Sequence, residues 1–334
     1  MILLGIDLSC TLVQTIAIVG VTGLISIIFL VNLYCYLTCG RCTTKLKMEG
    51  KTVIITGANS GIGKETASDL AKRGARVIMA CRNLDTAKAV QEEIIKETGN
   101  TSVILKKLDL SSQQSVREFA ADINKTESKL HVLIHNAGMA LAFRGAKSVD
   151  DIELTMATNH FGPFLLTHLL IDLLKKTAPS RIVVVASELY KLASVNLNNL
   201  NPVNTKPAAY IYYVSKYANI YFTRELARRL EGTGVTANFL HPGMIDSGIW
   251  RNVPFPLNYP MKLITRGFFK TTEQGAQTTI HLAVAEELNG VSGKYFMDCK
   301  EASLNRAAMD MEKALKLWEE SAKIVKLTEK DPQI

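Results

Sequence analysis

No charged side chain occurs between residues 8 and 40, and this long apolar run divides the chain into two unequal parts. Leu, Ile and Val dominate residues 12–37, and about 20 apolar helical residues suffice to cross a bilayer core of about 30 Å. A cleaved signal peptide would have a basic leader and a shorter apolar core, whereas the residues before this run include no Lys or Arg. The sequence therefore predicts a short leader over residues 1–10 and a transmembrane anchor over residues 11–39.

Basic residues flank only one end of the predicted anchor. Arg41, Lys45 and Lys47 follow it, in a juxtamembrane linker that we assign to residues 40–50. Because Lys and Arg accumulate on the cytosolic side of membrane proteins, we expect the leader in the lumen and everything after the anchor in the cytosol. The expected location is the endoplasmic reticulum membrane, crossed once.

From residue 51 to about residue 300, short β-branched runs alternate with amphipathic helical patterns. The predicted strands are Thr52–Thr56, Arg76–Ala80, Val103–Leu108, His131–Ile134, Arg181–Ala186, Val235–Leu240 and Lys294–Met297. The predicted helices include Gly63–Arg73, Leu84–Glu97, Asp150–Lys176, Tyr212–Leu230 and Glu273–Glu287. Nearly continuous apolar strands separated by helices indicate a parallel sheet that is covered on both faces. The fold class is therefore α/β, with a single doubly wound (Rossmann) sheet over residues 51–300 behind an N-terminal transmembrane helix.

Residues 301–334 are expected to form a C-terminal amphipathic helix and a tail. The helical pattern runs over Arg306–Leu327, with Trp318 among the apolar residues of one face. We expect this helix to pack on the domain or against the membrane rather than to bind a partner protein.

A glycine-rich turn lies between the first predicted strand and the first predicted helix. Its residues are Thr56, Gly57, Ala58, Asn59, Ser60, Gly61, Ile62 and Gly63. Glycine permits a tight turn and a close approach of the backbone to a pyrophosphate, while the helix N-terminus offers free N–H groups. Glycine also closes ordinary turns, but the strand–turn–helix context predicts a cradle for a dinucleotide.

The residue after the second strand bears on the choice of dinucleotide. An NAD site usually has an acidic side chain there, which accepts hydrogen bonds from the adenosine ribose. This chain has Arg82 instead, with Lys64 just beyond the glycine turn. Because a guanidinium pairs well with a 2′-phosphate, the sequence predicts NADP(H) as the cofactor. A solvated surface arginine beside an NAD site is the alternative.

Tyr212 and Lys216 are predicted to be neighbours on one face of a helix, because residues i and i+4 lie side by side there. Of the four tyrosines nearby, only Tyr212 has a lysine four residues further on. An ammonium and a nicotinamide charge beside a phenol would lower its pKa from about 10 by about 3 units. Tyr212 is therefore a candidate acid–base group near neutral pH, although this spacing is also common on exposed helix faces.

Several motifs in a fixed order make the chain resemble the short-chain dehydrogenase/reductase family over about residues 48–300. They are the glycine turn, Asn136-Ala137-Gly138 after the fourth strand, Ser187 after the fifth strand, and the Tyr212/Lys216 pair. The resemblance implies a nicotinamide cofactor and hydride transfer between an alcohol and a carbonyl compound.

The resemblance also implies roles for single residues. Tyr212 would donate or accept the proton, while Lys216 would bind the nicotinamide ribose and lower the Tyr212 pKa. Ser187 would orient the substrate oxygen, and Asn159 would hold a water in the proton relay. The further cofactor contacts that the resemblance implies are Asp109, Leu110, Asn136, Ala137, Gly138, Pro242, Gly243 and Ser247.

The chain departs from the commonest family pattern between its catalytic groups. Ser187 and Tyr212 stand 25 positions apart, and a long insert, Ser194–Ala209, separates them. Such an insert, together with Asn159-His160-Phe161-Gly162-Pro163-Phe164 and Leu317-Trp318-Glu319, resembles the subgroup of membrane-anchored retinol dehydrogenases.

An apolar segment, residues 244–270, follows the Pro242-Gly243 turn. In the family this segment covers the substrate, so Met244, Ile249 and Trp250 are candidate substrate contacts beside Ser187. A loop that packs on its own core or dips into the bilayer is the alternative. With the anchor, the segment predicts a hydrophobic alcohol or carbonyl substrate (a retinoid, an isoprenoid or a steroid), with reduction as the expected direction.

Two other functions fit the same residues, namely an NAD-dependent steroid or hydroxy-lipid dehydrogenase and a catalytically silent, membrane-tethered scaffold. A nucleic-acid partner is not expected, because the net charge of +8 comes from scattered residues rather than a basic stripe. Nor is a metal site, because His131, His135 and His160 lack a ligand spacing. Assembly into a homo-oligomer is left open.

Overall fold

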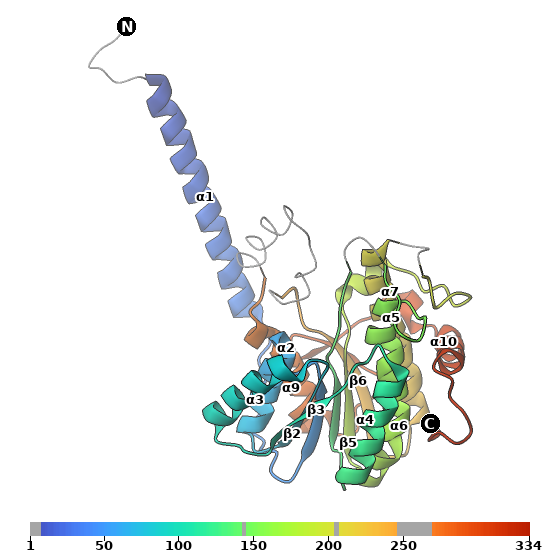
Figure 1. Cartoon of the computed structure of the whole chain (residues 1–334). Coiled ribbons are helices and arrows are strands. Elements are labelled where there is room, and N and C mark those ends of the chain that lie inside the picture. The colour runs from blue at the N-terminus through green and yellow to red at the C-terminus, as the bar shows by residue number, and fades with distance from the viewer. Residues whose placement is uncertain (1–7, 142–144, 204–206, 246–268) are drawn as a thin grey trace.

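The computed structural model of the chain describes residues 8–141, 145–203, 207–245 and 269–334. Helix α1 (Leu8–Thr38) projects away from the rest of the molecule (Figure 1). Within it, Thr11–Thr38 is long and apolar enough to cross a membrane, and none of its most apolar stretch is buried by the protein. An uncovered apolar helix of this length is the structure expected of a membrane anchor.

The rest of the described chain forms one sheet with the order β3-β2-β1-β4-β5-β6-β7-β8, in which β7 and β8 pair antiparallel and the other neighbours pair in parallel. The strands are β1 (Thr52–Thr56), β2 (Arg76–Cys81), β3 (Val103–Lys107), β4 (Val132–His135), β5 (Ser180–Val185), β6 (Val235–His241), β7 (Tyr295–Met297) and β8 (Lys300–Ala302). The strand order reverses between β1 and β4, where doubly wound folds bind their ligands. The predicted fold class is confirmed, and β8 is an additional edge strand that the sequence pattern did not indicate.

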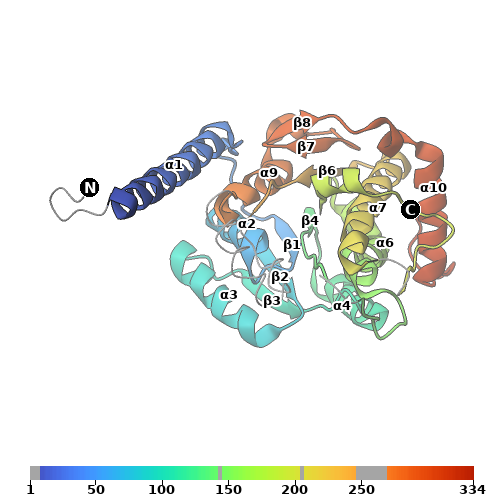
Figure 2. The same ribbon diagram turned by 90° about the horizontal axis from the view of Figure 1, so that it is seen from above.

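Helices cover both faces of the sheet (Figure 2). On one face lie α2 (Gly61–Lys72), α3 (Leu84–Thr98) and α9 (Thr272–Val284). On the other face lie α4 (Gln113–Thr126), α6 (Gly162–Thr177) and α7 (Ala208–Arg229), with α10 (Met311–Ile324) packed on α7. Along β1, Val53 and Ile55 point to the first face and Ile54 to the second, and all three are fully buried. Burial on both faces is the reason that these strands read as continuous apolar runs.

The predicted helix Asp150–Lys176 is interrupted near its start. A short α5 (Leu154–Met156) is followed by a π-helical turn, η1 (Ala157–Phe161), before α6 begins. Pro163 supplies the physical reason, because it has no N–H to offer the carbonyl of Asn159 four residues earlier and its ring crowds that oxygen. The wider turn accommodates this position, and π-helical turns of this kind occur frequently at functional sites.

The C-terminal helix is also divided, in contrast to the single helix predicted over Arg306–Leu327. A 3-10 turn, η5 (Arg306–Met309), precedes α10. Trp318 of α10 is 5% exposed and stacks on Phe222 of α7, with ring centroids 5.9 Å apart. Of the two locations expected for this helix, the structure therefore has the packed one.

The predicted linker, residues 40–50, lies against the domain. The Arg73 guanidinium donates hydrogen bonds to the carbonyls of Thr44 and Leu46 at 2.8 and 3.1 Å. Met48 is buried in the core beside α2. The anchor is thus joined to the sheet domain by a packed segment.

Two short 3-10 helices complete the described elements, η2 (Glu188–Leu192) after β5 and η4 (Glu286–Leu288) after α9. Helix α7 begins at Ala208, one turn before the predicted start at Tyr212. Tyr212 and Lys216 consequently lie within the helix, where both backbones are fixed by regular hydrogen bonding.

Candidate active site

A cleft of about 1120 Å³ lies at the carboxyl ends of the parallel strands. Seventeen of the predicted site residues line it: Gly57, Asn59, Ser60, Gly61, Ile62, Arg82, Asp109, Leu110, Asn136, Ala137, Gly138, Ser187, Tyr212, Lys216, Pro242, Gly243 and Met244. Thr56, Gly63 and Asn159 lie behind the cleft wall. Ser247, Ile249 and Trp250 lie outside the described residues.

Thr56 ties the glycine turn to the loop after β4. Its side chain is fully buried, and its hydroxyl oxygen accepts hydrogen bonds from the backbone N–H groups of Asn136 and Ala137, both at 3.0 Å. The Asn136 amide in turn donates to the carbonyl of Thr56 at 2.9 Å and to that of Gly57 at 3.2 Å. These bonds fix the two loops at the switch point relative to each other.

The glycine turn leaves no room for side chains. Gly57 has a φ of +67°, which favours glycine, and a Cβ on Gly63 would collide with the Gly57 carbonyl and the Asn136 amide. The side chain of Ser60, at the N-cap of α2, makes no capping hydrogen bond, so it does not satisfy the first N–H groups of the helix. Exposed N–H groups at a helix N-terminus suit a phosphate, and the turn therefore fits a pyrophosphate.

Arg82 and Asp109 also line the cleft, on the side that the glycine turn lines. We call this side the glycine-turn arm. Arg82 is exposed and makes no hydrogen bond or ion pair with any other described residue, so its guanidinium is available to a ligand. Lys64, by contrast, is paired with Glu93 at 2.6 Å. Asp109 accepts hydrogen bonds from the backbone N–H and the hydroxyl of Ser111, at 2.9 and 2.7 Å, which fix the orientation of its carboxylate.

Tyr212, Ser187 and Lys216 come together at the centre of the cleft. Lys216 is buried, and its ammonium donates a hydrogen bond to the Val185 carbonyl at 2.8 Å. The same ammonium lies 5.6 Å from the centroid of the Tyr212 ring. Ser187 lies close enough to Tyr212 to lower the pKa of its phenol, and both residues line the cleft, so the hydroxyls that the family resemblance assigns to the chemistry are neighbours.

The pKa values of this pair differ from the expectation drawn from the sequence. Burial raises the pKa of Tyr212 to about 12, against the opposing effect of its hydrogen bond with Ser187. Burial also lowers the pKa of the Lys216 ammonium to about 8. The expected lowering of the phenol pKa is therefore not met by Lys216 alone, because removal from water outweighs an ammonium that faces the ring and donates to Val185.

Asn159 is buried behind the cleft wall, in the π-helical turn. Its side-chain oxygen accepts from the backbone N–H of Met139 at 2.9 Å, and its amide donates to the Met139 carbonyl at 2.9 Å. The amide also donates to the Ser215 hydroxyl, at 3.0 Å, next to Lys216 on α7. Asn159 thus holds the cleft wall after Gly138 against α7.

A further set of residues, which the sequence did not indicate, lies behind Asn159. His160 is fully buried and bonds to the Asn219 side-chain oxygen at 3.2 Å and to the Ser321 hydroxyl at 2.9 Å. Asn219 donates its amide to the Asn159 carbonyl at 2.9 Å, the carbonyl that Pro163 leaves without its usual partner. We call Ser321, His160 and Asn219 the tail network, because these residues connect α10 to the π-helical turn η1.

The tail network fixes the His160 tautomer. The Asn219 oxygen can only accept, so Nδ1 of His160 carries the proton and Nε2 accepts from the Ser321 hydroxyl. Burial lowers the His160 pKa to about 4, which keeps the ring neutral near pH 7. The signal available in the sequence was Pro163 four residues after Asn159, whereas the partner Ser321 is too far along the chain to be found by spacing.

The remaining arm of the cleft, the apolar arm, is lined mainly by apolar side chains. Its lining includes Met139, Ala140, Leu141, Leu154, Leu189, Leu192 and Met244, of which only Met244 was predicted. Two charged residues next to Leu189 and Leu192 in the sequence, Glu188 and Lys191, also line the cleft and are paired with each other. Leu192 and Met244 are 63% and 64% exposed, so the rim presents apolar side chains to the outside. An apolar arm that ends at Tyr212 and Ser187 suits a hydrophobic ligand with one polar group.

Comparison with known proteins bears on this arrangement. Residues 51–255 match the family described as short chain dehydrogenase. Retinol dehydrogenase 12 of Mus musculus is 43% identical over 309 residues, which cover 91% of this chain and 96% of the relative. Retinol dehydrogenase 14 of Homo sapiens is 46% identical over 295 residues, which cover 84% and 88% of the two chains.

Solved structures share the fold. An uncharacterized protein from Mycobacterium paratuberculosis superposes with a TM-score of 0.68 at 31% identity, over 86% of this chain and 98% of that one. A Pseudomonas aeruginosa RhlG/NADP active-site complex superposes with a TM-score of 0.60 at 24% identity, over 75% and 95% of the two chains.

We expect His160→Phe to lower turnover by about tenfold, because it removes both bonds of the tail network and loosens the turn that carries Asn159. The readouts are kcat and the dissociation constant of the dinucleotide, and the latter should stay within about twofold. His168→Phe is the matched control. His168 is also buried on α6 beside Trp318, but among the described residues its hydrogen-bond partner is the Phe164 carbonyl, four residues earlier on the same helix. Equal losses of kcat in the two variants would contradict a positioning role for His160.

Lys216→Met should make the protein more stable at pH 7. At pH 7 the Lys216 amine is protonated in both the folded and the unfolded chain, and burial of the charged ammonium lowers the free energy of unfolding of wild type by about 3 kcal/mol. The variant avoids this cost but loses the hydrogen bond to Val185, which offsets about 1 kcal/mol of the gain. Between pH 8 and 10.5 only the unfolded chain holds this proton, so wild-type stability rises with pH and the advantage of the variant fades. Thermal unfolding midpoints at pH 7 and pH 10 test this expectation. Lys294→Met, which removes a half-exposed ammonium paired with Glu301, should show no such gain, and a variant less stable than wild type at pH 7 would refute the assignment.

Proposed function

We propose a specific activity for this chain, which belongs to the short-chain dehydrogenase/reductase family and is an oxidoreductase acting on an alcohol and the corresponding carbonyl compound. The proposed protein is a membrane-anchored, NADP(H)-dependent enzyme. It reduces a hydrophobic aldehyde or ketone, with Tyr212 as the proton donor. The observation that carries the proposal is the meeting of Tyr212, Ser187 and Lys216 where the apolar arm of the cleft joins the glycine-turn arm. The apolar arm would hold the substrate and the other arm the dinucleotide.

The residues of the cleft fit the dinucleotide along its whole length. Gly57, Ser60 and Gly61 would hold the pyrophosphate, and Asp109 the adenine. Gly138 lies beside Lys216, since a Cβ there would be 3.4 Å from Nζ. When bound, NADPH supplies the hydride, and the chain supplies the proton and the geometry.

Tyr212 and Ser187 would act together on the substrate oxygen. The raised Tyr212 pKa keeps the phenol protonated at neutral pH, which is the state that a proton donor needs. Ser187 would donate a hydrogen bond to the same oxygen and hold it within reach of the phenol. The Lys216 ammonium would stabilise the phenolate that remains after the proton has left. Asn159, whose side chain is hydrogen-bonded to Met139 and Ser215, would hold the cleft wall in place rather than bind the water of a proton relay.

The preference for NADP(H) is proposed from Arg82. Its guanidinium lies after β2, has no partner among the described residues and would suit a 2′-phosphate. The acidic residue typical of NAD sites is missing from the end of this strand. An NAD-linked steroid or hydroxy-lipid dehydrogenase is the alternative that this residue disfavours.

The substrate class is proposed from the apolar arm, the anchor and the relatives. The relatives are named retinol dehydrogenases, and the apolar lining and rim suit a retinoid, with isoprenoid and steroid carbonyls as the other candidates. Since cytosolic NADP(H) is kept largely reduced, the proposed direction is reduction. The proposed location is the endoplasmic reticulum membrane, crossed once, with the catalytic domain in the cytosol.

Tyr212→Phe should lower carbonyl reduction by about 10²- to 10⁴-fold, because it removes the acidic proton and little else. The measurement is single-turnover oxidation of NADPH with retinal and with farnesyl and steroid carbonyls. Tyr213→Phe is the control, since Tyr213 lies on the same helix with its ring centroid 6.1 Å from that of Tyr212. If wild type reduces none of these carbonyls and Tyr212→Phe changes nothing, the silent scaffold is the correct reading.

Arg82→Ala should weaken NADPH binding by about 10- to 100-fold and leave NADH binding within about twofold, because only NADPH carries the 2′-phosphate. Fluorescence titration of both cofactors measures the two constants. Lys64→Ala is the control, since its ammonium is already paired with Glu93. Equal weakening of both cofactors by Arg82→Ala would contradict the NADP(H) assignment.

A further inference from the structure

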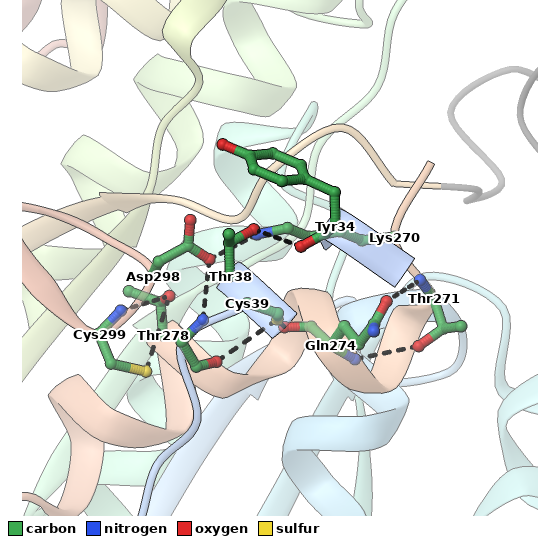
Figure 3. Close-up of polar contacts among 10 residues, drawn as sticks. Tyr34, Thr38, Cys39, Lys270, Thr271, Gln274, Thr278, Asp298 and Cys299 are labelled. Carbon is green, nitrogen blue, oxygen red and sulfur yellow. Dashed lines mark hydrogen bonds and ion pairs between the residues drawn. The ribbon is translucent and has the colours of Figure 1, made fainter. Parts of the chain in front are cut away.

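The end of the anchor meets the turn between β7 and β8 (Figure 3). The backbone N–H of Gly40, two residues after α1, donates a hydrogen bond to the Asp298 carboxylate at 3.2 Å. The two backbones touch, because a Cβ on Gly40 would overlap the Asp298 carbonyl. No side chain other than hydrogen fits at position 40 while this contact is made.

Asp298 also holds Lys270. The Lys270 ammonium lies 2.5 Å from the carboxylate oxygen that accepts from Gly40, and its side chain is 14% exposed. One carboxylate therefore joins the residue after the anchor to Lys270, the last residue of the apolar segment.

Lys270 in turn holds the cleft wall. Its aliphatic chain covers Gly243, where a Cβ would lie 2.8 Å from Cδ, and its backbone N–H donates to the Met244 carbonyl at 2.8 Å. Gly243, Met244 and the adjacent Ile245 line the cleft, as does Phe269. A continuous path of contacts thus runs from Gly40 through Asp298 and Lys270 to the wall beside the catalytic groups.

The turn that carries Asp298 is itself fixed. Asp298 and Cys299 have φ values of +48° and +60°, a conformation that Asp tolerates and most other residues avoid. The Cys299 N–H donates to the Thr278 hydroxyl of α9 at 3.2 Å. Next to it, the Cys42 N–H donates to the Gln277 side chain at 3.1 Å, so both partners of the contact are fastened to the same helix.

We infer that Lys270, Asp298 and Gly40 form a positioning joint, through which the membrane-proximal end of the chain fixes the Gly243–Ile245 wall of the cleft. Lys270, Asp298 and Gly40 do not line the cleft. They would affect ligand binding only by fixing the position of Gly243–Ile245. The inference rests on the proposed function only in taking NADPH and a hydrophobic carbonyl compound as the ligands of the cleft. It assigns to the start of the linker a second task besides joining the anchor to the domain, which is to hold one side of the active site in place.

The test uses the full-length protein in detergent micelles and three variants. Lys270→Met keeps the aliphatic cover over Gly243 and removes the ammonium, while Gly40→Ala forces the two backbones apart. Asp298→Asn removes the charge and retains a residue that tolerates the left-handed conformation. Each should raise the dissociation constant of NADPH, measured by fluorescence titration, and the KM of retinal by about three- to tenfold. The combination Lys270→Met/Gly40→Ala should be no worse than the poorer single variant, because both break one path.

Two controls separate the joint from general stability. Glu301→Gln breaks the Lys294–Glu301 pair on the same hairpin, and Gly23→Ala adds a methyl group where nothing lies within 4 Å. Both should leave the NADPH and retinal constants unchanged. Joint variants that melt earlier but bind NADPH like wild type, or a double variant with multiplied effects, would overturn the inference. Because NADPH binding is measured without turnover, the joint can be judged even if no carbonyl is reduced.

Discussion

A buried ammonium is the constraint around which the cleft is built. Lys216 makes no ion pair within the described chain, and it is held by one carbonyl, that of Val185, at 2.8 Å. Burial of a charge without a carboxylate partner destabilises a fold, and such groups persist where they serve a site. Two neighbouring features surround this ammonium: the backbone of Gly138 lies beside Nζ, and the Tyr212 ring lies one helical turn away with its centroid 5.6 Å from Nζ.

Features set by nearby residues could be predicted from the sequence. The glycine turn, the doubly wound sheet and the Tyr212/Lys216 pair each depend on residues a few positions apart, and the structure brings them together at one cleft. Features that depend on burial or on residues far apart in the sequence could not be predicted. The Tyr212 pKa rises because of burial that spacing does not show, and Ser321 reaches His160 across 161 positions. The broken helix before Pro163 was predictable in principle, but a continuous apolar pattern concealed it.

The active site is held from outside by both ends of the chain. The tail network reaches the turn of Asn159 from α10, and the positioning joint reaches Gly243 from the end of α1. Both use hydrogen-bonded side chains at places where the backbone cannot be regular, a proline in one case and two left-handed residues in the other. Polar groups of this kind fix geometry more sharply than apolar packing does, because each has few satisfactory partners.

The position of Ser321 near the C-terminus has a consequence for synthesis on the ribosome. The apolar helix α1 emerges before the sheet and is available to a membrane while the sheet is still being translated. The turn of Asn159 lacks its hydrogen-bonded support until α10 has left the exit tunnel and docked through Ser321 and Trp318. In a nascent chain, α1 can therefore enter a membrane well before α10 docks and completes the support of the Asn159 turn. A stop codon ahead of Ser321 would release a nearly complete domain that lacks this support.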